Sequence, residues 1–193
     1  MSINNILLIM EFRFLQDFLK HSCRWDDVEK NEDGDLDEAD FDKLLYRQNV
    51  AARAAYYELN ALVESEIYAA ASGPWQASNH KGPKTLSECL SSGKDLKFMK
   101  MVEDLSIKDA ISLIEKEYKV KLLDFPGYVE VFKVRETVND FKHRKGFVDF
   151  RKQSPDQIKF ADRRKVDVDT ANFAISCAKD FIYALRKITG TYS

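Results

Sequence analysis

The residues best suited to chemistry lie in one short basic segment, Val134 to Gly146. Arg135, Asn139 and His143 follow one another at intervals of four residues, so on a helix they would lie one above the next. Histidine can donate or accept a proton near neutral pH, and arginine can hold a phosphate through two hydrogen bonds. The pattern predicts a site for RNA cleavage without a metal or cofactor, in which the substrate's own 2′-hydroxyl attacks the phosphorus.

In that chemistry His143 would act as acid and base, Asn139 would position a group, and Arg135 or Arg144 would bind phosphate. Four neighbouring cations are the predicted RNA-binding residues: Lys142, Arg144, Lys145 and Arg151. A purely structural explanation exists beside this one, because the helix dipole also favours cations and histidine in a last turn.

A helix must position these residues, and the segment from Pro126 to Lys145 has the right pattern. Pro126 suits a first turn, and Gly146 suits the position after the last one. The predicted buried face consists of Val131, Val134, Val138 and Phe141. Arg135, Asn139 and His143 would flank that apolar face, at the edge of the core.

Four further helices are predicted, at residues 5–21, 38–71, 107–118 and 170–188. Their expected boundaries are Ser72-Gly73-Pro74 after the second, a Ser106 cap before the third, and Gly190 after the last. The first helix should bury Leu8, Phe12, Leu15, Phe18 and Leu19, the second Ala51, Ala55, Leu59 and Leu62, and the last Phe173, Cys177, Phe181, Ala184 and Ile188. Residues 78–95 are predicted as a loop, and 147–150 could form one short strand. The sequence thus predicts an all-α, up-and-down bundle of about five helices in a single domain, residues 1–193.

The segment Asn139-Asp-Phe-Lys-His143 resembles the signature helix of the HEPN superfamily, small all-α proteins of prokaryotic defence and toxin systems and of RNA processing. In that family an Arg, often followed by Asn, precedes the His by four to six residues. The resemblance implies a HEPN-like bundle at residues 41–193, after an N-terminal helix and acidic connector at residues 1–40. It also implies RNA as the ligand, endoribonuclease activity, and a homodimer that builds one cleft from two such helices.

This chain departs from the HEPN motif at one position. Val138 stands where the family's Arg would be, and Arg135 lies eight residues before His143. Either Arg135 reaches the same place from the previous turn, or the nuclease site is degraded. The alternative function is a non-catalytic helical protein that docks a protein partner through the same basic helix end.

A third function is suggested by an acidic segment, Glu29 to Asp40, which resembles an EF-hand calcium loop. Asn31, Asp33 and Gly34 match its third, fifth and sixth positions. Glu29 replaces the usual Asp at the first position, and Asp40 replaces the usual Glu at the twelfth. A solvated acidic connector is the alternative explanation.

Charge and cysteine content suggest where such a protein works. The net charge is −2, yet residues 26–42 hold ten acidic residues and residues 142–165 hold nine Lys or Arg. The three cysteines show no metal-binding spacing, and free thiols fit a reducing compartment. The apolar run near Leu7 is too short for a membrane span. We therefore expect a cytoplasmic protein without a membrane partner.

Overall fold

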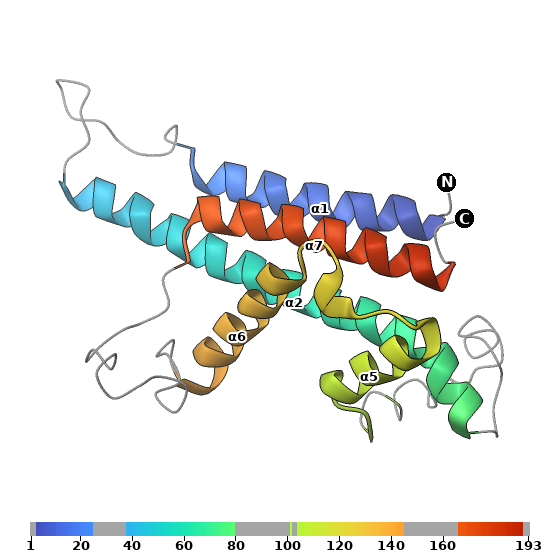
Figure 1. Ribbon diagram of the computed structural model, residues 1–193. Coiled ribbons are helices and arrows are strands. Elements are labelled where there is room, and N and C mark those ends of the chain that lie inside the picture. Colours follow the sequence, from blue (N-terminus) through green and yellow to red (C-terminus); the bar gives the residue numbers. More distant parts are fainter. Residues whose placement is uncertain (1–2, 25–37, 80–100, 102–103, 145–165, 191–193) are drawn as a thin grey trace.

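The computed structural model describes residues 3–24, 38–79, 101, 104–144 and 166–190. Within these residues the chain forms α-helices and one 3₁₀ turn, without a β-strand (Figure 1). The elements are α1 (Ile3–Ser22), α2 (Glu38–Asn79), α5 (Ile107–Tyr118), η1 (Leu122–Asp124), α6 (Tyr128–Arg144) and α7 (Val168–Thr189). The prediction of an all-α bundle of about five helices is confirmed.

The long helix α2 is the centre of the bundle and contacts each of the other four helices. α1 runs antiparallel to α2, and α7 returns alongside both, parallel to α2 (Figure 1). The shorter helices α5 and α6 pack against α2 on the side remote from α1 (Figure 1). An ion pair between Arg186 of α7 and Glu66 of α2 joins two helices, and Arg186 also donates to Asn5 Oδ1 of α1 at 2.8 Å.

The core follows the predicted apolar stripes of α1 and α2 closely, but that of α7 only at Phe181. The predicted residues of α1 are buried except Phe18, and those of α2 are buried except the half-buried Leu62. Of the predicted residues of α7, Phe181 is buried, Phe173 is 60% exposed, and Cys177, Ala184 and Ile188 are half-buried. The α7 residues that are buried are Ala171, Ala174, Ile175, Ala178, Phe181, Ile182 and Leu185. Alanines carry little weight in an apolar pattern, but they let two helices approach closely, and they shift the buried face away from Phe173.

The predicted end of α2 at Ser72-Gly73-Pro74 is wrong, because the helix continues to Asn79 with Pro74 inside it. Proline removes one backbone donor and crowds the preceding turn. Here the Ser72 hydroxyl donates to the Ala69 carbonyl at 2.7 Å, and Ala71 and Pro74 are both buried. Tertiary packing of this turn offsets the local cost of the proline.

The predicted boundaries of α5 and the end of α7 are confirmed. The Asp109 backbone N–H donates to the Ser106 hydroxyl at 3.2 Å, which caps α5. Asp167 and Thr170 form a reciprocal capping box at the start of α7. Gly190 ends α7 in the left-handed conformation, with φ of 71°.

The start of α6 depends on Gly127 and not on Pro126 as predicted. The first helical residue is Tyr128, and Gly127 has φ of 78°. A Cβ atom on Gly127 would lie 2.0 Å from the Cys177 carbonyl oxygen of α7. Only glycine satisfies both the positive φ and this close approach, so Gly127 fixes how α6 leaves the surface of α7.

Three predicted features lie outside the described residues: most of the EF-hand-like segment 29–40, the loop after residue 79, and the strand at 147–150. Residues 38–40 form the first turn of α2. Among the described helices, none combines the length and the apolar character that crossing a bilayer would need.

Candidate RNA-contacting surface of α6 and α2

The apolar face of α6 is the one that the sequence predicts. Val131, Val134 and Val138 are buried, and Phe141 packs half-buried against the same core. Val138 is 0% exposed, so the position that the HEPN motif gives to Arg points into the core of this bundle. Burial of a guanidinium at this position would be costly, whereas Val suits the apolar packing.

Arg135 is held on α2 by an ion pair. Its Nε donates to Glu64 Oε1 at 3.0 Å, and both side chains are about one-third exposed. Eight residues separate Arg135 from His143, which corresponds to about 12 Å along a helix axis. In the structure Arg135 is held at Glu64 of α2 and not at His143.

Arg144, the alternative phosphate ligand, contacts a carboxylate one turn earlier. Its Nε donates to Asp140 Oδ1 at 3.0 Å, and the Asp140 side chain is only 3% exposed. A buried carboxylate needs a cation or hydrogen-bond donors, and Arg144 supplies both. The structure therefore gives Arg144 a role within the helix itself.

Two cations of this surface lie against aromatic rings. The Lys142 ammonium is 5.7 Å from the centre of the Tyr57 ring, and the Arg53 guanidinium is 5.8 Å from that of Phe141. Lys142 is exposed and Tyr57 half-buried. Exposed cation–π contacts are worth about 0.5–1 kcal/mol, so a ligand can replace them at small cost.

The remaining predicted site residues differ in accessibility. His143 is exposed in the last turn of α6, and Asn139 is half-buried one turn earlier. Lys145 and Arg151 lie outside the described residues. The C-terminal part of α6 thus offers the exposed side chains of His143 and Lys142 beside the half-buried amide of Asn139.

Tyrosines near α6 do not add an acid or base at neutral pH. Burial, together with the nearby carboxylates of Glu130 and Asp167, raises the pKa of Tyr56 to about 12. Burial and the neighbouring Glu64 also raise the pKa of Tyr68, whose hydroxyl donates to the Leu105 carbonyl at 2.9 Å. Both phenols stay protonated under physiological conditions.

The part of the chain that the structure describes contains no group of three or more His, Cys, Asp or Glu side chains placed to hold a metal ion. His21 Nδ1 lies 2.7 Å from the Asp17 carbonyl oxygen, one turn earlier on α1.

Four residues of this surface were missed in the sequence: Arg53, Tyr57, Glu64 and Asp140. A helical period shows which face a residue occupies, but not which face of another helix it meets. For α2 the only sequence signal is that Arg53, Tyr57 and Glu64 fall at spacings of four and seven, which places them on one face. For Asp140 the only sequence signal is that it precedes Arg144 by four residues, a spacing that allows an ion pair on one helix.

Comparison of the chain with models of known protein families, with curated proteins and with solved structures gives no match. The fold and the surface described above define the class of protein: an all-α bundle with a cationic and aromatic surface on α2 and α6.

Proposed function

We propose that this protein binds single-stranded RNA through the surface formed by Arg53 and Tyr57 of α2 and Lys142 and His143 of α6. The observation that carries the proposal is the contact between exposed Lys142 and the Tyr57 ring. An aromatic ring beside a cation can stack a base while the cation binds the adjoining phosphate. The cytoplasm is the compartment in which the protein would meet RNA.

Binding is favoured over cleavage by a single chain because two of the cations are already paired. Arg135 is bound to Glu64 and Arg144 to Asp140. Lys142 and His143, both exposed, are free to approach a phosphate without breaking those pairs. Because the net charge of the chain is −2, attraction of RNA must come from this local surface.

Cleavage is the second candidate function, and exposed His143 favours it. In the HEPN-like model a homodimer brings two such helices into one cleft. A histidine from each copy then lies on opposite sides of the scissile phosphate, one as base toward the 2′-hydroxyl and one as acid toward the leaving oxygen. Asn139, half-buried one turn earlier, would position the base.

RNA binding is tested with a mixed-sequence, labelled single-stranded RNA in EDTA. We expect Lys142→Glu to weaken binding at least tenfold, and affinity to fall as salt rises. The matched control is Lys108→Glu, on an exposed position of α5. The proposal is overturned if wild type does not bind, or if both substitutions weaken binding equally.

Cleavage is tested in the same tubes by following the length of the RNA. The nuclease function predicts fragments from wild type and none from His143→Ala, with RNA binding retained by the variant. If neither protein cleaves, cleavage is excluded and binding is judged on its own result. Sedimentation of the wild type with and without RNA tells whether active species are dimers.

A further inference from the structure

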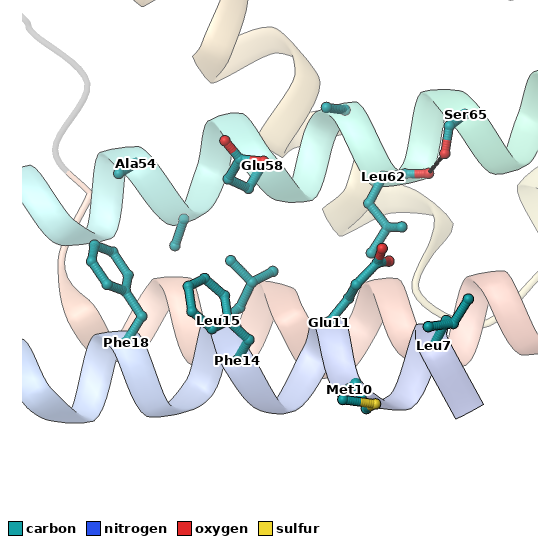
Figure 2. Close-up of a pocket in the computed structure, with 12 residues that line it drawn as sticks. Leu7, Met10, Glu11, Phe14, Leu15, Phe18, Ala54, Glu58, Leu62 and Ser65 are labelled. Carbon is teal, nitrogen blue, oxygen red and sulfur yellow. Dashed lines mark hydrogen bonds between the residues drawn. The ribbon is translucent and has the colours of Figure 1, made fainter. Parts of the chain in front are cut away.

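A groove of about 710 Å³ runs along the surface between α1 and α2, away from α6 (Figure 2). Large side chains from α1 form one side and small ones from α2 form the other. The residues that define it are Leu7, Met10, Phe14 and Phe18 of α1 with Ala54 and Ala61 of α2. It shares no residue with the proposed RNA surface, so the two proposals stand or fall separately.

The α1 side of the groove is a second apolar stripe on a helix that already buries one. Leu7, Met10, Phe14 and Phe18 follow one another at spacings of three, four and four, which places them on one helical face. Leu7 is 52% exposed, Met10 59% and Phe14 68%. Exposed apolar side chains gathered on one helical face, in contrast to singly scattered ones, are a common feature of interaction sites.

The shape of the groove fits a helix. Ala54 and Ala61 are two turns apart on α2 and leave room for another backbone to approach. From Leu7 to Phe18 the stripe extends about 16 Å, which corresponds to three turns of an α-helix. The Phe14 and Phe18 rings are already stacked, with centroids 6.5 Å apart and planes 13° from parallel, so this end of the stripe is preformed.

The charged residues of the groove favour some partner helices over others. Its only charged lining residues are Glu11 of α1 and Glu58 of α2, both exposed. In the described residues neither carboxylate forms a close ion pair, although Glu11 lies near enough to Arg186 of α7 to contribute to the raised pKa of that guanidinium. A Lys or Arg beside the apolar residues of a bound helix would pair with these carboxylates of the groove lining, which favours such a partner over a neutral or acidic one.

A second copy of this chain is a poorer occupant. Two copies seated face to face would bring four carboxylates, two from Glu11 and two from Glu58, to one apolar interface. Like charges across an interface disfavour association. The same carboxylates would face the headgroups of an anionic membrane surface, where repulsion again opposes contact.

We propose that the α1–α2 groove binds an amphipathic helix of another protein, one that carries apolar residues at positions i, i+4, i+7 and i+11 and a flanking Lys or Arg. The partner is thus a basic amphipathic helix, and the protein holds it by helix-in-groove packing.

The test uses two labelled 16-residue helical peptides on an alanine background, with Leu at the four apolar positions and either two Lys or two Glu beside them. We expect the Lys peptide to bind at least ten times more tightly than the Glu peptide. Phe14→Glu should abolish binding of the Lys peptide, and the double variant Glu11→Lys with Glu58→Lys should reverse the peptide preference. Circular dichroism establishes whether each variant remains folded. If Phe14→Glu does not fold, Phe14→Ala is used in its place.

Reversal of peptide preference supports the proposal, because general stickiness of an apolar patch would not depend on charge sign. Equal affinity for both peptides, or no binding of either, overturns it. So does self-association of the wild type at micromolar concentration that Phe14→Glu abolishes, since a second copy would then occupy the groove. Co-sedimentation with phosphatidylserine vesicles but not with the peptides overturns it in favour of a lipid surface.

Discussion

Two surfaces that share the long helix α2 are built in opposite ways. Along α6, Arg135 is paired with Glu64, Arg144 with Asp140, and Lys142 lies over Tyr57. Along α1, large apolar side chains such as Phe14 stand exposed above Ala54 and Ala61. A ligand at the first surface must replace the contact of Lys142 with Tyr57 and gains nothing from the cations that are already paired, whereas a ligand at the second gains burial that the chain itself lacks. The surface along α6, whose residue types suggest chemistry, is thus the one whose side chains already have more partners.

The comparison is tested most strongly by two phenylalanines of α1. Phe12 is buried and Phe14 is 68% exposed, although they lie two residues apart. We expect Phe12→Ala to lower the free energy of unfolding by about 3–5 kcal/mol and Phe14→Ala to change it by less than about 0.5 kcal/mol. Urea unfolding followed by circular dichroism measures both. A large loss from Phe14→Ala would show that this face is part of the core.

The packing of the start of α6 against α7 is tested by Gly127→Ala. The added Cβ would need a positive φ and would meet the Cys177 carbonyl at 2.0 Å, so we expect a loss of about 3 kcal/mol. Gly73→Ala is the control, because a Cβ there meets nothing within 4 Å and alanine favours the helix. Thermal unfolding should show opposite shifts for the two variants. Equal shifts would mean that the contact with α7 does not hold α6.

Two glutamates of α2 that differ in burial give the next effect. Glu66 pairs with Arg186, with both side chains at most 15% exposed, whereas Glu58 is exposed in the groove. Glu66→Ala leaves Arg186 without this carboxylate, and we expect a loss of about 2–3 kcal/mol. Glu58→Ala should change the free energy of unfolding by less than about 0.5 kcal/mol. Similar values from denaturant titration would remove the distinction between the paired Glu66 and the exposed Glu58.

The smallest effect depends on pH. The pKa of Tyr56 is about 12 in the folded protein, against 10 for an ordinary tyrosine. The unfolded chain therefore loses this proton first, and the folded state loses stability as pH rises from 10 to 12. Tyr56→Phe should remove a pH-dependent loss on the order of 2 kcal/mol at pH 12. Exposed Tyr46→Phe controls for the general effect of one phenol, and parallel pH profiles for Tyr56→Phe and wild type would contradict the assignment.

The sequence predicts much of the secondary structure because local signals decide it. Ser106 and Gly190 mark helix ends through their own side chain or backbone, and the buried face of α6 follows from spacing alone. Pro74 is the exception, since its local signal for a helix end is overcome by burial that no local pattern shows.

The candidate site is predicted less completely. The stripe of Arg135, Asn139 and His143 lies beside the buried face as predicted, because all three positions belong to one helix. The partners of Arg135 and Lys142 lie on α2, more than seventy residues away in the sequence, and a single sequence contains no signal for such pairs.

By itself, the sequence of this protein determined that it is helical, where most helices end, and which basic residues share one face of α6. Only the tertiary structure decided which of those cations are paired and which face of α7 is buried. The physical reason is range: caps and periodicity act over a few residues of one helix, whereas ion pairing and burial depend on which surfaces of distant helices meet.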